Sequence, residues 1–273
     1  MKRSARTAPF TFAAALFLLL TSSLCARDWL SIERGVQYRE FQGDGLHAFV
    51  ARVDLTRGDI EVIATNESEK GLVVSEFAKR TDAIVSINAD YFDEQMRTVG
   101  HARGSEGPWK ERHGTRNQPV IGFSKDRAEI FRLESRESDL PGWVEHAVSG
   151  WPALIEDCTV YTAEQLPGSD HFTRAPHPRT AVGLTADGKT LYLVVADGRR
   201  EGVPGPTLAE LGTFMKEQLG VCSALNLDGG GSTEMVVEGQ IVNIPSDGEE
   251  RVVANHLAVV EAAVKPRRSK SKQ

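Results

Sequence analysis

Residues 180–195 read TAVGLTADGKTLYLVV. Two apolar runs flank a short polar segment, which is the pattern of two paired strands. Asp187-Gly188 in that segment supplies the positive φ that a tight turn requires. We therefore predict a β-hairpin of strands 180–185 and 190–195.

A helix is predicted downstream of this hairpin, over residues 208–219. Thr207 stands at the N-cap position and Glu210 follows three residues later, which is the pattern of a capping box. Gly220 follows the last helical residue, where glycine ends a helix in the left-handed conformation. The apolar run 224–227 then predicts a buried strand that ends at Asp228.

Short apolar runs predict strands through most of the remaining chain. Residues 47–55 and 59–64 are expected to be neighbouring strands joined at Arg57-Gly58. Residues 134–177 predict a loop-rich, ordered excursion across one face. The other predicted elements are a short helix at 75–80, a buried run at 83–87, strands at 120–123, 129–133 and 256–261, and a hairpin of 235–238 with 240–244. Strands outnumber helices, so we predict a single α+β domain with a mixed, mostly antiparallel sheet.

The N-terminus has the three-part layout of a secretory signal peptide. A basic start precedes an apolar run at 10–20, and small residues follow before the chain turns polar at Arg27. The run has about 11 residues, too few for a transmembrane helix, which needs roughly 20. We predict cleavage after Cys25 or Ala26 and export to the periplasm or the medium; a lipid anchor on Cys25 is the alternative.

The charge of the processed chain disfavours nucleic acid as a partner. Residues 1–26 contain three of the 32 basic residues and no acidic ones, so 29 basic side chains face 38 acidic ones and the net charge is −9. A surface of this sign repels a phosphate backbone. The predicted domain spans 27–264, and residues 265–273 form a basic tail that we predict to be disordered.

Two cysteines, Cys158 and Cys222, remain after the predicted cleavage. So few cysteines suit an exported protein that depends on its core rather than on a disulfide framework. A single bridge between the two is conceivable, and it requires their Cα atoms to lie close together.

Asp228 opens the segment with the clearest chemical character. It ends a predicted buried strand and precedes Gly229, Gly230 and Gly231, whose small size permits close approach to a ligand. Successive glycine N–H groups form nests for anions, and Ser232 and Thr233 add hydroxyl donors. A plain turn between two strands is the competing interpretation. The segment lacks the Gly-Lys-Ser/Thr ending of a nucleotide-binding loop.

Three further strand ends carry candidate residues. Asp197 follows the strand 190–195, so it is expected at the same sheet edge as Asp228, and glycosidases use such carboxylate pairs. Arg179 opens the hairpin and offers a forked cation suited to phosphate. Asn88 and Asp90 follow the buried run 83–87, where Asn88 either binds a sugar hydroxyl, orients Asp90 or caps the strand. A tight turn and a surface arginine are the competing interpretations of Asp197 and Arg179.

Several motifs together resemble the phosphodiester glycosidase family. They are Asn88–Phe92, Arg179-Thr180, Asp197–Arg199, Thr207–Leu211, Asn226–Ser232 and Arg251–Asn255, and they extend the resemblance over roughly residues 80–262. The resemblance implies hydrolysis of a sugar-1-phosphodiester, with N-acetylglucosamine or a related sugar on a cell-surface or extracellular glycan as substrate. Arg179, Arg251 and the glycine loop would then bind the departing phosphate, Asp228 or Asp197 would face the sugar carbon, and Asn88 and Asn255 would position hydroxyl groups.

Two other functional classes fit parts of the pattern. A non-catalytic module would use the arginines and the glycine loop only to bind an anionic or phosphorylated polysaccharide. A phosphodiesterase would cut the P–O bond and would normally need a metal cluster. Asp197, Asp228 and loop oxygens are candidate ligands for calcium or magnesium. The seven histidines contain no His-Glu-x-x-His pattern, which disfavours a zinc site.

Overall fold

The computed structural model describes residues 25–262 except 27, 34 and 44. The predicted signal peptide up to residue 24 and the predicted tail at 265–273 lie outside the described residues. Within the described part, no helix is long and apolar enough to cross a membrane.

The largest sheet is antiparallel and has the order β1-β3-β4-β15-β14-β16-β12-β13, with β2 paired to β3. The predicted hairpin forms its centre, where β14 and β15 pair from Arg179 opposite Ala196 to Leu184 opposite Leu191. Its strands are β1 (Cys25–Ala26), β2 (Leu30–Glu33), β3 (Val36–Gly43), β4 (Leu46–Asp54), β12 (Ala153–Glu156), β13 (Thr159–Val160), β14 (Arg179–Leu184), β15 (Thr190–Ala196) and β16 (Ser223–Asn226).

Two five-stranded antiparallel sheets complete the fold, with the orders β10-β9-β11-β7-β8 and β18-β17-β6-β19-β5. The first contains β7 (Arg103–Gly104), β8 (Gly107–Pro108), β9 (Val120–Ser124), β10 (Arg127–Phe131) and β11 (His146–Ser149). The second contains β5 (Ile60–Ala64), β6 (Val85–Asn88), β17 (Met235–Val237), β18 (Gln240–Ile241) and β19 (His256–Glu261). The prediction of an α+β domain with mostly antiparallel sheets is confirmed.

The main core lies where the sheets face one another. Leu193 and Leu225 of the large sheet, Ile87 and Leu257 of the third sheet and Phe123 of the second belong to one buried cluster. Full burial of each such side chain contributes on the order of 2 kcal/mol. The core therefore fixes how the ends of strands from different sheets meet.

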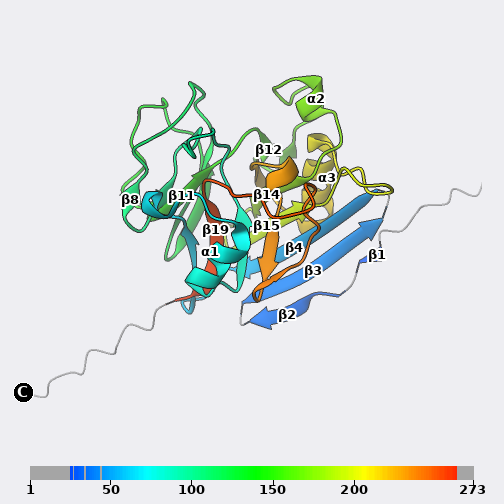
Figure 1. Ribbon diagram of the computed structural model, residues 1–273, viewed down its shortest axis with the longest axis horizontal. Coiled ribbons are helices and arrows are strands. Elements are labelled where there is room, and N and C mark those ends of the chain that lie inside the picture. The colour runs from blue at the N-terminus through cyan, green and yellow to red at the C-terminus, as the bar shows by residue number, and fades with distance from the viewer. Residues whose placement is uncertain (1–24, 27, 34, 44, 263–273) are drawn as a thin grey trace, which may run out of the picture.

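Two of the helices cover outer faces of the sheets, one on the third sheet and one on the large sheet. The α-helices are α1 (Val74–Thr81), α2 (Asp170–Thr173) and α3 (Leu208–Leu219), with 3₁₀ turns η1 (Glu67–Glu69) and η2 (Gly230–Ser232). α3 buries Leu211 and Met215 against the large sheet. Figure 1 shows α2 projecting at the outer edge of the molecule, beyond α3.

The predicted capping of α3 is confirmed. The Glu210 N–H donates to Thr207 Oγ1 at 3.2 Å, and the Thr207 N–H donates to Glu210 Oε2 at 2.8 Å. Gly220 closes the helix in the left-handed conformation with φ 71°. The local sequence thus determined both helix ends.

One prediction about strands was wrong, and one strand was not predicted. β4 and β5 are not neighbours, because β4 pairs with β3 and β15 on its two sides while β5 pairs with β19 in another sheet. The strand β3 was missed because only Val36 and Phe41 in it are buried, so its sequence VQYREFQG is mainly polar. The excursion at 134–177 also contains β11 and β12, short strands separated by Gly150-Trp151-Pro152.

A disulfide joins Cys158 and Cys222, as the sequence allowed. Their Cα atoms lie 3.8 Å apart and the bond closes a loop across 64 residues. It fastens the turn after β12 to the start of β16, which leads to Asp228.

We predict that the Cys158→Ser/Cys222→Ser variant is about 4 kcal/mol less stable than the oxidised protein, because the bridge restricts a long loop of the unfolded chain. Urea unfolding of both proteins, with and without reductant, measures this difference. The variant serves as its own control, since reductant should not change its midpoint. Equal midpoints for oxidised wild type and variant would contradict the prediction.

Candidate active site

The ends of four strands meet at one end of the sheets. Arg179 begins β14 opposite Ala196, the last residue of β15, and Asn226 ends β16 opposite Ala181. Arg179, Asp197 and Asp228 therefore lie at the same end of the large sheet. Asn88 at the end of β6 reaches them from the third sheet, since its Nδ2 donates to the Asp228 carbonyl at 2.7 Å.

Each glycine after Asp228 has a separate steric reason. Gly230 has φ +63°, in the left-handed region that favours glycine. A Cβ on Gly229 would lie 2.8 Å from the Pro178 carbonyl oxygen, and one on Gly231 would collide with the Arg251 guanidinium. The three glycines thus allow the loop to lie between the start of β14 and Arg251.

The amide nest expected in this loop is largely absent. The Gly229 N–H donates to Asp228 Oδ1 and the Gly230 N–H to the Pro178 carbonyl, both at 2.9 Å. The Ser232 and Thr233 N–H groups donate to carbonyls within the loop. These four amides hold the loop in shape, so positive side chains must provide most of any anion binding here.

Asp228 is the predicted carboxylate that stays partly accessible to solvent. Burial raises its pKa to about 6, while hydrogen bonds from Ser232 and the Gly229 N–H and the charge of Arg251 oppose that rise. Ser232 is itself buried, and Arg251 Nη1 lies 3.5 Å from its hydroxyl. Asp228 is therefore charged at neutral pH but close to its titration range.

Three arginines surround the glycine loop. Arg199 is exposed, and its guanidinium lies against Gly230. Arg251 covers Gly231 and pairs with Asp247. Arg179 is only 3% exposed and lies beneath the loop, its Cα facing Gly229. The loop thus has arginines close to each of its glycines, with the Asp228 carboxylate at its start and the Asp247 carboxylate, paired with Arg251, against Gly231.

Arg179 is a buried cation with no carboxylate partner in the part of the chain that the structure describes. Its guanidinium donates to the carbonyls of Phe172 at 2.6 Å, Ala175 at 3.1 Å and Pro206 at 3.4 Å. Burial lowers its pKa to about 10, and the charge of Arg199 adds to that lowering. An uncompensated buried charge is costly, and an anion in this place would offset the cost.

Asn88, Asp90 and Asn255 form a buried frame behind the loop. Asn255 Nδ2 donates to Asp90 Oδ2 at 2.6 Å, and the Asp90 N–H donates to Asn255 Oδ1 at 2.9 Å. The Ser149 N–H donates to Asp90 Oδ1 at 2.8 Å. Burial raises the pKa of Asp90 to about 8, so this carboxyl is mostly protonated at neutral pH. Asn88 bonds instead to the Thr180 hydroxyl and to the backbone of Asp228 and Glu234, so all three side chains are engaged.

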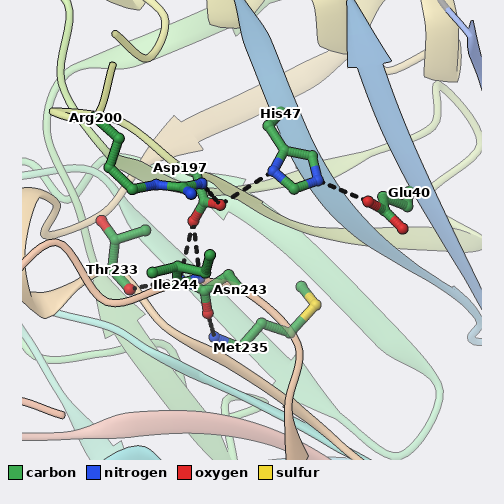
Figure 2. Close-up of polar contacts among 8 residues, drawn as sticks. All are labelled: Glu40, His47, Asp197, Arg200, Thr233, Met235, Asn243 and Ile244. Atoms are coloured by element: carbon green, nitrogen blue, oxygen red, sulfur yellow. Dashed lines mark hydrogen bonds and ion pairs between the residues drawn. The ribbon is translucent and has the colours of Figure 1, made fainter. Parts of the chain in front are cut away.

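Asp197 lies in a different set of contacts, shown in Figure 2. Its Oδ2 accepts from Arg200 at 2.5 Å and lies 3.1 Å from His47 Nδ1, and the other nitrogen of that ring lies 2.7 Å from Glu40 Oε1. Its Oδ1 accepts from the Ile244 N–H at 3.1 Å. The Asp197 side chain is fully buried, and both of its oxygens are engaged.

Asn243 connects Asp197 to the glycine loop. Its Nδ2 lies 3.4 Å from Asp197 Oδ1 and donates to the carbonyl of the buried Thr233 at 3.0 Å, while its Oδ1 accepts from the Met235 N–H at 2.8 Å. Asp197 therefore supports the loop from behind, and the structure does not place it beside Asp228 as a second accessible carboxylate.

An aromatic group near Asp228 was not predicted as part of the site. The Tyr91 hydroxyl donates to the Trp151 carbonyl at 3.1 Å and accepts from Asn226 at 2.6 Å. Trp151 stacks on Phe172, with ring centroids 5.2 Å apart. Burial raises the pKa of Tyr91 further above its usual value, and the charge of Asp228 adds to the rise. Tyr91 lies within the motif after Asn88, but Phe172 gave no signal in the sequence.

The predicted calcium or magnesium site stays a prediction. Within the described residues, no three His, Cys, Asp or Glu side chains are grouped to share a metal ion. Carbonyl or substrate oxygens would have to complete a set of ligands around Asp228.

Comparisons with known proteins agree on one family. The sequence profile described as phosphodiester glycosidase matches residues 81–260, more than half of the chain. The SPbeta prophage-derived uncharacterized protein YomE of Bacillus subtilis strain 168 is 36% identical over 193 residues, which cover 68% of this chain and 29% of that protein. The human N-acetylglucosamine-1-phosphodiester alpha-N-acetylglucosaminidase is 30% identical over 187 residues, covering 64% and 36%.

Solved structures show the same fold. The zebrafish N-acetylglucosamine-1-phosphodiester alpha-N-acetylglucosaminidase catalytic domain, auto-inhibited by its pro-peptide, gives a TM-score of 0.65 at 21% identity and covers 91% of this chain and 86% of that one. A hypothetical protein from Synechocystis gives 0.64 at 15% identity, covering 86% and 63%. The chain spans about a third of the length of the curated relatives it matches.

We predict that Asp228→Asn gains stability relative to wild type as the pH rises from 4 to 7. The pKa of Asp228 is higher in the folded protein, about 6, than its ordinary 3.8. A raised carboxyl pKa stabilises the fold at low pH, and this contribution is lost as the pH rises through the folded pKa. Two pKa units correspond to about 3 kcal/mol at most. Urea unfolding at pH 4 and pH 7 measures the change.

Asp197→Asn is the matched control, since Asp197 is also a strand-end aspartate followed by glycine. It is paired with Arg200 and His47, so its removal should destabilise the protein at pH 7. If Asp228→Asn were instead destabilised by the same amount as Asp197→Asn, Asp228 would be a structural residue.

Proposed function

This chain belongs to the phosphodiester glycosidase family, as its motifs predicted, and on that basis we propose that it hydrolyses the glycosidic bond of a sugar-1-phosphodiester. The sugar that we propose is N-acetylglucosamine or a related one, carried on a cell-surface or extracellular glycan. The observation that carries the proposal is the partly accessible Asp228, on which the charge of Arg251 acts, at the same end of the large sheet as the buried, carboxylate-free cation of Arg179. The negative charge of Asp228 is opposite to the positive charge that develops on the sugar carbon when such a bond breaks. The positive charge of Arg179 is opposite to the negative charge that develops on the departing phosphate.

The reaction separates charge along the C1–O bond. The bonding electron pair leaves with the phosphate oxygen, the sugar carbon becomes oxocarbenium-like, and water then adds to C1 and loses a proton. The products are a reducing sugar and a phosphate monoester. A phosphate is a good leaving group, so stabilising the two charges matters more than protonating the leaving oxygen. A preorganised charge of this kind contributes on the order of 3 kcal/mol to lowering the barrier.

We assign the cations to the phosphate and Asp228 to the sugar carbon. Arg179 would bind the phosphate from beneath the loop, and Arg199 and Arg251 would approach it from the accessible side. Asp90, mostly protonated at neutral pH, would add no second negative charge next to Asp228. Asn88, Asn255 and Asp197 would position the loop rather than touch the sugar, because their side chains are buried and engaged.

We also propose that the protein works outside the cytoplasm. The predicted signal peptide motivates this, and the Cys158–Cys222 disulfide supports it because such bonds persist in oxidising compartments. N-terminal sequencing of the native protein tests the predicted processing near Arg27.

Hydrolysis in ¹⁸O-labelled water distinguishes the proposed reaction from its alternatives. Attack at C1 places the label in the reducing sugar, and attack at phosphorus places it in the phosphate. A non-catalytic binding module would release neither the reducing sugar nor a phosphate product. Including a chelator in parallel reactions tests the predicted calcium or magnesium requirement.

We predict label in the sugar, and a loss of turnover of about two orders of magnitude or more in Asp228→Asn. We also predict that kcat/KM falls about tenfold per pH unit below pH 6, since protonation removes the Asp228 charge. Label in the phosphate would refute the glycosidase assignment. Full activity of a well-folded Asp228→Asn would refute the role of the carboxylate.

Arg179→Gln tests the other half of the site. We expect kcat/KM for a sugar-1-phosphodiester to fall by about two orders of magnitude, because a charge-assisted contact to the leaving group is lost. Weak hydrolysis of an aryl glycoside of the same sugar, which has no phosphate, should change far less. A thermal melt must show that the variant folds, since Arg179 also holds α2. Equal losses on both substrates would mean that Arg179 does not act on phosphate.

A further inference from the structure

Two arginines and two aromatic rings form a continuous stack beside the candidate active site. The Arg116 guanidinium lies 3.7 Å from the Trp151 ring centroid. Trp151 and Phe172 stack with an interplanar angle of 20°. Arg179 lies 5.4 Å from the centroid of Phe172. A cation therefore contacts each ring of the aromatic pair.

Hydrogen bonds attach this stack to the site. The Trp151 carbonyl accepts from the Tyr91 hydroxyl at 3.1 Å and from Asn226 Nδ2 at 2.9 Å. The charges of Asp228, Arg179 and Arg116 all act on the pKa of the Tyr91 phenol, so Arg116 lies near the candidate active site.

Arg116 is exposed and forms no ion pair with a carboxylate of the described residues. Arg174 is also exposed but pairs with Glu164 and Asp170, whereas Arg199 at the glycine loop resembles Arg116 in having no such pair among the described residues. The Trp151 ring holds the Arg116 guanidinium by a cation–π contact and leaves its N–H groups free. A planar fork held in this way is preorganised for a phosphate or a carboxylate.

Arg116 and Arg179 are held in different surroundings. Arg116 is exposed and contacts the Trp151 ring. Arg179 is buried, contacts the Phe172 ring and donates to the carbonyls of Phe172, Ala175 and Pro206. This difference favours separate anions for the two arginines.

We propose that Arg116 on Trp151 is a second anion subsite, which binds a negatively charged group on the unit next to the scissile phosphodiester. This inference rests on the proposed function and names the substrate class more closely: a glycan with at least two anionic groups, phosphate or carboxylate. The anion displaces solvent from the fork of Arg116 while Trp151 keeps the guanidinium in place.

Binding without turnover tests the subsite. Asp228→Asn protein is titrated with an alkyl monophosphate, with alkane bisphosphates of increasing spacer length, and with ω-carboxyalkyl phosphates, while tryptophan fluorescence is recorded. At one spacer length the two-headed ligands should bind about tenfold or more tightly than the monophosphate, the size of one charge-assisted contact. Comparing the bisphosphate and carboxyalkyl series shows which anion the subsite prefers.

Substitutions then locate the effect. Arg116→Gln in the same background should lose the tenfold preference and keep the monophosphate affinity. Trp151→Phe should abolish the fluorescence change, which identifies the reporter among the four tryptophans. Arg132→Gln removes another exposed arginine, one paired with Glu156, and should change nothing.

The outcomes separate the two proposals. Equal affinity for one-headed and two-headed ligands at every spacer length would overturn the subsite, and so would a preference that survives Arg116→Gln. These measurements need no catalysis. If the protein shows the Arg116-dependent preference but releases no sugar from any phosphodiester, the subsite proposal stands and the proposed glycosidase activity is refuted.

Discussion

The arrangement of the site depends on the buried amide of Asn88. Its Nδ2 donates to the Asp228 carbonyl, and its Oδ1 accepts from Thr180 Oγ1 at 2.7 Å and from the Glu234 N–H at 3.2 Å. One side chain thereby joins β6 of the third sheet to the start of β14 and to both ends of the glycine loop. Loss of that amide would leave several buried polar groups without partners, at about 1–3 kcal/mol each. The position of Asp228 is therefore set by a contact between sheets.

The polar residues of the site divide by accessibility into a frame and a working surface. Asn88, Asp90, Asp197 and Asn255 are almost completely buried and bond to one another or to backbone. Asp228 stays partly accessible; the charge of Arg251 acts on it, and Asp90 near it is mostly protonated at neutral pH. The catalytic charge that we propose for Asp228 would need rigid neighbours that do not neutralise it, and these buried residues have that character.

The sequence predicted what local patterns encode. The hairpin at Asp187-Gly188, the cap at Thr207 and the strand ending at Asp228 follow from turn chemistry, capping and an apolar run, and all three were confirmed. Such local patterns do not determine the direction in which a side chain points. Asp197 and Asp228 both end strands before glycine, yet His47 and Arg200 hold the first fully buried while the second stays partly accessible. His47 and Asn243 become neighbours of Asp197 only because strands that are distant in the sequence pair with one another. The unpredicted strand β3 shows that a mainly polar strand, and therefore its pairing, is hard to recognise in a sequence.

The way Arg179 is held has a consequence for how this scaffold diversifies. The guanidinium is fastened by carbonyls of the short segment around α2, at Phe172 and Ala175, while the glycine loop is shaped by its own amides and by Asn88. Any residue type supplies a backbone carbonyl, so the hydrogen bonds to the arginine do not depend on the side chains of this segment. The Phe172 ring contact does depend on its side chain. Residues of the segment other than Phe172 can therefore vary at the edge of the candidate site without removing a hydrogen bond to Arg179.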